Sequence, residues 1–433
     1  MRRRIVYNSR VPVLRFPPFL LPLIFISITG HVALSGGRLT GSLFILNNGY
    51  PEALVGLFMA AFSVVSVLTS LKVGRWVDSA GAVRAMRIGV VLVLIGAWLP
   101  VLYLSVPALL LTAVMIGFGF GVISMAAQHT VGHLVPNATP AQRMANFGWY
   151  ALGHSTSSVV GPFVAGLLID AVSVRASFAA MALSACVSTF LVARRINGLP
   201  GAISRKAADR TPDPALAGAS EPDEVAAHVR RPPHVLDLLA TPEMRRIYWV
   251  NSLAATSWDL FIVMLPVLGH RLGFSASVIG TVFSFFALGT FAARAVMPWL
   301  SRRFTEWQIL RAAMVVITLV FVALPWLSLA PLLMGAGIIF GAAVGLSQPN
   351  MLSLLHTAAP AGRGGEAVGL RSMLSNGCSV VVPLAFGAAL STVSIGTLLF
   401  GGAVLFGTGV YPAHRGAKAS RRSRRPNSNS GSA

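Results

Sequence analysis

Asp259 and Arg38 are charged side chains that lie inside long apolar runs of a chain of 433 residues. Placing a charge in a hydrocarbon environment is costly, so residues of this kind are candidates for function. A carboxylate removed from water holds a proton more readily, so Asp259 could load and release one. Arg38 could bind an anionic group, or pair with Asp259 in one conformational state. A purely structural pair is the competing interpretation, and Arg38 could also extend to outer headgroups.

Uncharged polar side chains accompany these two residues in other apolar runs. They are Gln128, Gln348, Asn350 and Asn376. Such groups can orient a ligand, and they also hold helices together in a membrane. Trp258, next to Asp259, could stack on an aromatic or cationic substrate or simply fill space.

Histidines and one further arginine complete the set of candidates. His31 and His154 lie in apolar runs, where a titrating role in coupling is open to them. His129 and His133 are four residues apart, a spacing that can hold Zn²⁺, but no third ligand accompanies them. We therefore expect no metal and no cofactor. Arg294 lies near the end of its apolar run and is expected to extend toward the lipid headgroups.

The composition indicates the elements that must position these residues. Hydrophobic residues make up 55% of the chain and charged residues 11%, against roughly a quarter in soluble domains. The net charge of +21 would suit a nucleic-acid binder, but the basic residues fall at helix ends and in tails. Cys186 and Cys378 both lie in apolar runs, so no disulfide framework is indicated. The chain is predicted to be an all-α polytopic membrane protein that binds no nucleic acid.

Twelve apolar stretches are long enough to cross a bilayer, which takes about 20 helical residues. They run over residues 18–42, 53–73, 84–104, 107–130, 144–169, 174–193, 247–268, 276–297, 308–328, 331–355, 367–391 and 393–411. The predicted organisation is an N-terminal tail (1–17), a six-helix half (18–193), a linker (194–246), a second six-helix half (247–411) and a basic tail (412–433). The linker is rich in Pro, Ala, Arg and acidic residues, a composition typical of disorder.

The distribution of Lys and Arg predicts the orientation. Thirty of them, Arg371 included, fall on one side of this topology, against Arg175 and Arg271 on the other. By the positive-inside rule both termini and the linker are cytoplasmic. The basic N-terminus precedes an apolar run that continues past a signal peptide's length with no convincing cleavage site, so we interpret it as an uncleaved first span.

The two halves resemble each other in sequence, as expected for a transporter built from repeats. Gly121 and Gln128 are aligned with Gly341 and Gln348, and Trp76 with Trp299. Gly148, Pro162 and Gly166 are aligned with Gly369, Pro383 and Gly387, all 221 residues later.

The segment from Gly74 to Arg84 (GRWVDSAGAVR) carries the most specific local motif. It resembles the G-x-x-x-D-x-x-G-x-x-R loop between helices two and three of the major facilitator superfamily. The resemblance implies a twelve-helix fold and a short loop in which Gly74 and Gly81 permit a tight turn. Asp78 would then accept hydrogen bonds from a helix N-terminus or pair with an arginine, locking one face shut. Four further strings resemble a proteobacterial branch of the superfamily: Ser35–Arg38, Trp258–Phe261, Gly345–Pro349 and Gly364–Arg371.

The resemblance implies a secondary transporter of a small molecule, working as a monomer by alternating access in a bacterial inner membrane. Proton-coupled efflux of an amphiphile is the leading prediction, because long apolar helices with few charges suit such a substrate. The alternative is uptake or uniport of a small organic anion held by Arg38. Drug/proton antiporters of the superfamily usually carry an arginine in the fourth helix, where this chain has Ala113. No phosphate-binding G-x-x-x-x-G-K loop and no nucleophile with its base are evident, so neither an ATP-driven pump nor an enzyme is expected.

Overall fold

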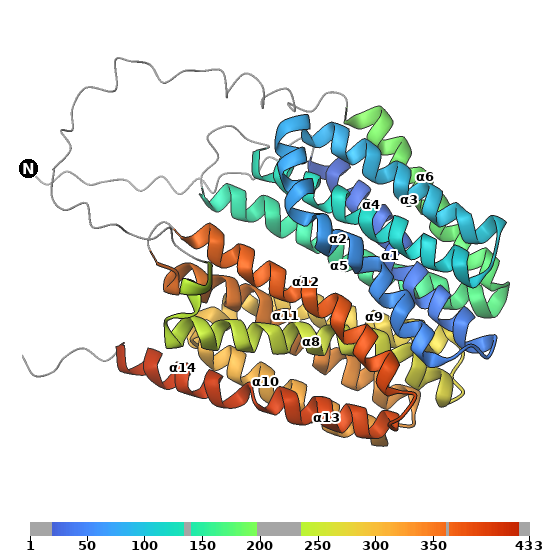
Figure 1. Ribbon diagram of the computed structural model, residues 1–433. Coiled ribbons are helices and arrows are strands. Elements are labelled where there is room, and N and C mark those ends of the chain that lie inside the picture. Colours follow the sequence, from blue (N-terminus) through green and yellow to red (C-terminus); the bar gives the residue numbers. More distant parts are fainter. Residues whose placement is uncertain (1–19, 134–139, 197–234, 361–362, 424–433) are drawn as a thin grey trace, which may run out of the picture.

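The computed structural model describes residues 20–133, 140–196, 235–360 and 363–423. Within these ranges the secondary structure is helical (Figure 1). The helices are α1 (Leu20–Asn47), α2 (Glu52–Ala80), α3 (Ala82–Leu102), α4 (Val106–His133), α5 (Pro140–Ala171), α6 (Val174–Arg195), η2 (Val235–Leu239), α8 (Pro242–Arg271), α9 (Ala276–Arg303), α10 (Glu306–Ala323), η3 (Leu324–Trp326), α11 (Ala330–Ala358), α12 (Gly364–Ala389), α13 (Ile395–Gly407) and α14 (Val410–Ser423).

Twelve of the described segments are long and apolar enough to cross a membrane, as the sequence predicts. Helices α1 to α6 form one half, which we call the N-half, and α8 to α14 form the C-half (Figure 1). Ser or Thr side chains cap the first turns of five helices by accepting a backbone N–H bond: Ser173, Thr241, Ser275, Thr305 and Ser394. These capping residues determine the positions at which the five helices begin.

Two helix boundaries differ from the sequence prediction. The loop expected from Gly74 to Arg84 is almost entirely helical, because α2 continues to Ala80 and α3 begins at Ala82. Gly81 alone breaks the helix, with a φ of 88° that glycine adopts without strain. The tail expected from residue 412 is also helical: α14 follows α13 after a break at Thr408 and Gly409 and continues to Ser423. A strong polar–apolar division of α14 lets it pack against α10, with Gly416 over the ring of Trp307.

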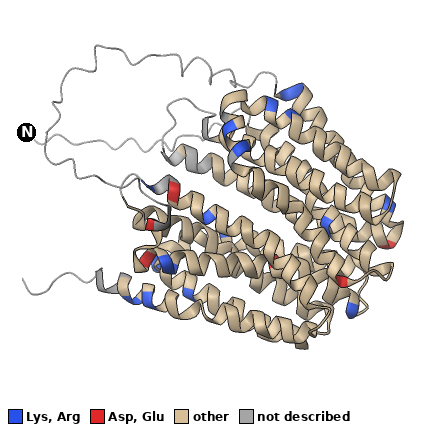
Figure 2. Cartoon of the chain, viewed as in Figure 1, with Lys and Arg blue, Asp and Glu red and all other residues tan. Residues whose placement is uncertain are grey.

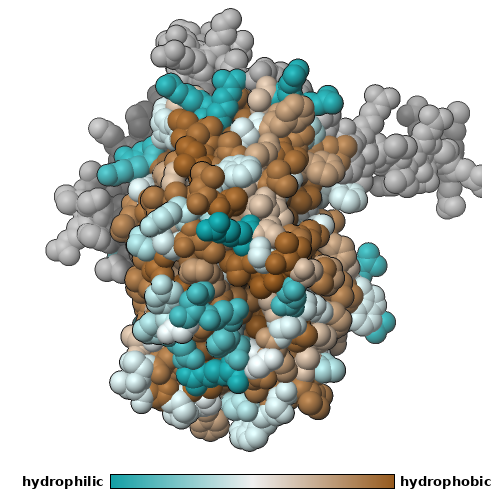
Figure 3. All heavy atoms as spheres, turned by 90° about the vertical axis from the view of Figure 1, so that its right-hand side faces the viewer, coloured by the Kyte–Doolittle hydropathy of each residue, from teal (hydrophilic) through white to brown (hydrophobic). Residues whose placement is uncertain are grey.

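The outer surface is suited to lipid. Large apolar side chains are exposed on it, including Leu68, Phe190, Leu319 and Ile339. Figure 3 faces the end where α1 ends and α2 begins, and there apolar side chains surround patches of polar ones. Figure 2 shows most of the coloured Lys and Arg residues at the end where α3 begins and where α6 and α9 end. We call this end, which holds Arg84, Arg195 and Arg303, the basic end, and the opposite one, where α1 ends and α2 begins, the far end.

The two halves repeat the same helix contacts, and glycines make these contacts possible. A Cβ on Gly117 would meet the backbone of Phe62, and a Cβ on Gly341 would meet the backbone of Phe286. Ser66 and Thr290 donate hydrogen bonds to the carbonyls of those two glycines. The matched members of every pair lie 224 residues apart.

These contacts correct one part of the predicted alignment. Gly341 corresponds to Gly117, not to Gly121, and Gln348 does not correspond to Gln128. The error is one helical turn. Because a shift of four residues keeps the same helix face, small residues repeated at this spacing cannot fix the alignment of a helix by themselves.

Candidate functional site

The halves are in direct contact at the far end, through two helix pairs that repeat each other. A Cβ on Gly56 of α2 would meet the Pro383 carbonyl of α12, and a Cβ on Gly280 of α9 would meet the Pro162 carbonyl of α5. Backbone-to-backbone contact this close is what small residues allow between membrane helices. Both prolines belong to the predicted repeat, and here they close the same end of the molecule.

Polar contacts reinforce this closure. Arg271 at the end of α8 donates to both carboxylate oxygens of Glu52 at the start of α2, at 2.6 and 2.5 Å. Asp170 at the end of α5 accepts hydrogen bonds from the backbone N–H groups of Ala276 (3.1 Å) and Ser277 (2.7 Å) at the start of α9. A carboxylate at a helix N-terminus also interacts favourably with the helix dipole.

A cavity lies between the halves on the other side of this closure. It has two adjoining parts, of about 450 Å³ and 310 Å³, that share Arg38, Asn376 and Ser379. The larger part reaches toward the basic end, where Val73 and Gln128 line it. The molecule is therefore closed at the far end and hollow from its middle toward the basic end.

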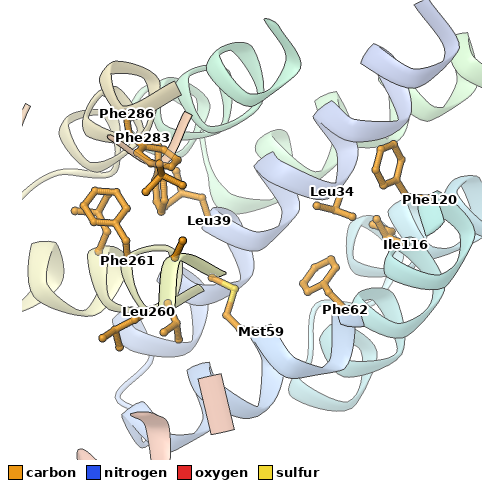
Figure 4. Packing of buried hydrophobic residues seen from close by; sticks show 14 of the residues in the cluster. Leu34, Leu39, Met59, Phe62, Ile116, Phe120, Leu260, Phe261, Phe283 and Phe286 are labelled. Carbon is orange, nitrogen blue, oxygen red and sulfur yellow. The ribbon is translucent and has the colours of Figure 1, made fainter. Parts of the chain in front are cut away.

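The two walls of the cavity differ in chemistry. The N-half supplies the more apolar wall, from α2 and α4, where Phe62, Phe118, Phe120 and Met125 lie among polar side chains. The polar ones are Ser63, Ser66, Thr69, Ser70, Ser124 and Gln128. The C-half supplies a mainly polar wall. Its members include Asn251, Asp259, Ser347, Gln348, Arg371, Ser372, Ser375 and Asn376. Figure 4 shows apolar side chains of both halves, with Phe62 and Phe120 of the N-half wall and with Phe261 and Phe286 packed in the C-half.

Asp259 lines the polar wall and has one hydrogen-bond donor among the described residues. The hydroxyl of Ser379 in α12 lies 3.1 and 3.0 Å from its two carboxylate oxygens. Helix α8 is held against α12 by bonds from Asn251 to the Ser375 hydroxyl and from Tyr248 to the Ala367 carbonyl, which fix this arrangement. An ionised carboxylate can accept about four hydrogen bonds. Asp259 therefore has acceptor sites left for a proton or a ligand.

Arg38 lies where all parts of the cavity meet. Its guanidinium lies 5.1 Å from the centroid of the Phe62 ring, and its Nε is buried without a hydrogen-bond partner among the described residues. Its charge interacts with that of Asp259, yet no ion pair or hydrogen bond joins the two side chains. An unsatisfied buried donor costs about 1–3 kcal/mol, and more when it is charged. Arg38 therefore has hydrogen-bonding capacity that no described residue uses.

Small residues bring Arg38 into this place. A Cβ on Gly36 would meet the Met181 side chain and the Gly161 carbonyl, so α1 lies unusually close to α5 and α6. Thr40 shares a 2.7 Å hydrogen bond with Ser177 of α6 on the same side of the helix. The Ser-Gly-Gly-Arg string thus packs one face of α1 tightly and leaves Arg38 on the cavity face.

Comparisons with known proteins agree with this architecture. The family model of the Major Facilitator Superfamily matches residues 20–383. The chain belongs to this superfamily. Helical membrane transporters of this kind are not enzymes, and the predicted twelve-helix, two-half fold is confirmed.

Among curated proteins, human solute carrier family 67 member A1 (Homo sapiens) is 26% identical over 286 residues. The match covers 65% of this chain and 64% of the relative, so it spans less than two thirds of that protein's length.

Solved superfamily transporters share the fold. A POT family transporter in complex with thioalcohol conjugated peptide has a TM-score of 0.71 at 12% identity, over 94% of this chain and 96% of that chain. A POT family transporter in complex with 5-aminolevulinic acid gives 0.69 at 12%, over 94% and 97%. The peptide transporter POT in complex with sulfate gives 0.70 at 17%, over 94% and 95%.

Most predicted site residues reach the cavity of this superfamily member. Gln128, Gln348, Asn376 and Trp258 all line it beside Arg38 and Asp259. Trp258 also packs edge-on against Phe286, at 4.8 Å between ring centroids, so it serves both packing and the cavity wall.

Asn350 does not reach the cavity. It is 1% exposed, and its amide donates to the Leu346 carbonyl at 2.7 Å and approaches the Met297 sulfur of α9 at 3.7 Å. Residues two apart point to different sides of a helix, so Gln348 and Asn350 of α11 cannot both line one cavity.

Two arginines are placed differently from their prediction. Arg294 does not extend to headgroups; it donates to the Ser155 hydroxyl (2.6 Å) and the Ala151 carbonyl (3.4 Å) of α5. It therefore joins the two halves near their middle. Arg371, counted with the basic side, lines the cavity, and its buried Nε has no hydrogen-bond partner among the described residues. Its position at a helix end gave no sign of this in the sequence.

His31 and His154 are packed against each other rather than isolated. Their ring centroids lie 3.9 Å apart, and His31 Nδ1 is 2.9 Å from the Ser157 hydroxyl. His31 and Arg38 also line a small pocket of about 70 Å³ beside the main cavity. In the motif at the α2–α3 junction, Gly74 lies in α2, Arg84 lies in α3 and Gly81 is the break between them, whereas the side chain of Asp78 lies outside the described residues.

Proposed function

We propose that the chain is a proton-coupled secondary transporter that carries a small organic anion in the same direction as a proton. Arg38 holds the anion and Asp259 holds the proton. The observation that carries this proposal is a shared cavity: it holds Arg38, whose buried Nε has no hydrogen-bond partner among the described residues, and Asp259, whose one donor among those residues is Ser379.

The coupling follows from the charges of these two residues. When Asp259 is ionised, its negative charge offsets that of Arg38 and weakens the attraction for an anion. A proton on Asp259 removes this competition, so proton and anion favour each other's binding. By linkage the anion strengthens proton binding by the same factor. Mutual strengthening of this kind suits symport, whereas antiport needs ligands that exclude each other.

The apolar wall supports an amphiphilic substrate. Phe62, Phe118 and Phe120 of the N-half could pack against an apolar body while the polar wall of the C-half holds the anionic group. The proposed substrate class is therefore a small organic anion with an apolar part.

We place the basic end in the cytoplasm of a bacterial inner membrane, because positively charged residues of membrane proteins concentrate on that side. The termini and linker are then cytoplasmic, and the conformation is inward-open. We expect the protein to work as a monomer by alternating contact of the two halves.

Proton-coupled efflux of an amphiphile is the second candidate. It is favoured by the same apolar wall. It is also favoured if Asp259 releases its proton when the substrate binds, so that proton and substrate replace each other. The two candidates differ in the direction of proton movement, which one experiment can determine.

The test uses purified protein in liposomes that contain a pH-sensitive dye, with equal pH on both sides. Hexanesulfonate and benzenesulfonate are added outside; their fixed charge prevents them from crossing the lipid as neutral acids. Symport acidifies the lumen as the anion enters, and antiport makes it more alkaline. Empty liposomes provide the baseline.

Asp259→Asn should abolish the pH change, and Arg38→Gln should abolish sulfonate entry. Glu366→Gln is the matched control, because Glu366 lies in α12, pairs with Arg363 at 2.6 Å and does not line the cavity. Alkaline shifts would favour efflux. Absence of any sulfonate-dependent pH change, or an unchanged response in Asp259→Asn, would refute the proposal.

A further inference from the structure

Arg371 occupies a place in the cavity that the proposed function leaves unexplained. It lies in α12, within two turns of the start of that helix, and lines the smaller, polar part of the cavity. Asn251, Ser372 and Ser375 line the cavity with it. A second arginine thus faces the same space as Arg38.

The Arg371 guanidinium has no partner among the described residues. Its Nε is buried, and no hydrogen bond or ion pair joins the side chain to any residue that the structure describes. The carboxylate in the same helix, Glu366, is already bound to Arg363 at 2.6 and 2.9 Å. A buried donor without a partner is costly, and a charged one more so. The cavity therefore contains two arginines whose buried Nε atoms have no acceptor in the part of the chain that the structure describes.

The separation of the two arginines follows from α12. Arg371 precedes Ser379 by eight residues, which corresponds to about 12 Å along the helix axis. Ser379 is bound to Asp259 and lines both parts of the cavity with Arg38. Arg371 thus lies nearer the basic end, two turns from the level of Asp259. Because both side chains are long, their guanidinium groups can reach opposite ends of one small molecule.

The charges on the cavity wall match a ligand with two negative charges. Among the described residues that line the two parts, the charged side chains are Arg38, Arg371 and Asp259. When Asp259 carries a proton, the wall has two positive charges and no negative one. A monoanion would leave one guanidinium unpaired in a partly dehydrated space.

We propose that Arg371 forms a second anion subsite and that the substrate is a small dianion with an anionic group at each end. One group binds Arg38 beside Asp259, and the other binds Arg371 toward the basic end. The carbon skeleton between them packs against the apolar wall. This inference rests on the proposed function, since it extends the Arg38 site to a second group.

The test compares two probes with the same carbon skeleton, hexanesulfonate and hexane-α,ω-disulfonate. Their affinities for the purified full-length protein are measured by calorimetry. The pH is chosen low enough that sulfonate transport runs at half its maximal rate or faster. Variants are Arg371→Gln and Arg371→Lys, with Arg363→Gln as the matched control at the same end of α12. Arg38→Gln reports on the first subsite.

We expect the wild type to bind the disulfonate about tenfold more tightly than the monosulfonate, the effect of one added charge-assisted hydrogen bond. Arg371→Gln should remove this preference and keep the monosulfonate affinity, which also shows that the variant is folded. Arg371→Lys should restore part of the preference, and Arg363→Gln should leave it unchanged.

Equal affinities of the wild type for the two probes would overturn the second subsite. If monosulfonate binding still depended on Arg38, the proposed function would stand without it. If Arg371→Gln weakened both probes equally, Arg371 would act as a general positive charge and the subsite would be rejected. Failure of the wild type to bind either sulfonate would overturn both the proposed function and the second subsite.

Discussion

Replacing Gly56 with alanine should prevent closure of the far end. In the present conformation a Cβ on Gly56 would lie 2.9 Å from the Gly387 Cα and even closer to the Pro383 carbonyl oxygen. Both neighbours are backbone atoms of α12, so no side-chain rotation can relieve the overlap. Closing the far end would then require α2 and α12 to move apart.

The expected size of this effect follows from overpacking. Forcing an added methyl group into a packed contact costs about 1–3 kcal/mol. That cost applies only to the conformation in which the two halves touch here, so it shifts the equilibrium between conformations by about 5- to 150-fold. Alanine also favours the helix itself over glycine, by roughly 0.5–1 kcal/mol. Gly56→Ala should therefore keep the fold and accumulate molecules with an open far end.

Thiol labelling can measure this shift. Native Cys186 and Cys378 are first replaced by serine. A reporter at Ser70, in the cavity wall toward the basic end, should react more slowly with a polar maleimide in Gly56→Ala than in the parent. A reporter at Ile262, in the small pocket beside Arg38, should react faster.

Gly369→Ala is the matched control, because a Cβ at that position of α12 meets no atom within 4 Å. It should leave both labelling rates unchanged. If Gly56→Ala labels like Gly369→Ala at both reporters, glycine contacts do not set the conformational equilibrium and the reasoning is refuted.

Four further predictions follow from the same contacts. Arg271→Glu should open the far end by at most a fewfold, because the pair with Glu52 is partly exposed; adding Glu52→Arg should restore the parent's Ile262 labelling. Asn350→Ala should lower the thermal midpoint and leave the calorimetric sulfonate affinity unchanged, and a tenfold weaker affinity would contradict its placement away from the cavity. Arg294→Gln removes a bond between the halves, so flux assays should show a slower maximal rate at unchanged affinity. With one proton per cycle a monosulfonate moves without net charge and a disulfonate carries one negative charge, so an inside-negative potential set with valinomycin should slow entry of the disulfonate alone.

The sequence predicted the membrane architecture because its causes are local. A run of apolar residues long enough to cross a bilayer has one stable structure there, and charged residues are confined to its ends. Asp259 and Arg38 could be identified for the same reason: each interrupts an apolar run, and the structure places both in one cavity.

Other features depend on helix rotation and tilt, which apolar composition does not specify. Asn350 and Gln348 looked equivalent in the sequence, but only Gln348 faces the cavity. The repeat could be detected from Pro162 and Pro383, although its alignment in α4 and α11 was one turn off, because that alignment is fixed by contacts with Phe62 and Phe286 of neighbouring helices.

Arg371 shows most clearly why a count of charges on each side of the membrane is not enough to assign a role to an arginine. Near the end of an apolar run, an arginine that faces lipid or water reaches polar surroundings. Its only role is then to help set the orientation of the chain in the membrane. The same residue on a helix that lines the space between two separated halves enters a cavity instead. What distinguishes the two cases is whether the charge finds an acceptor. Arg363, eight residues before Arg371, pairs with Glu366, whereas the buried Nε of Arg371 has no acceptor among the described residues. Arg38 and Arg371 are thus set apart from the other basic residues by the partners they lack, and it is this lack that a transported anion could fill.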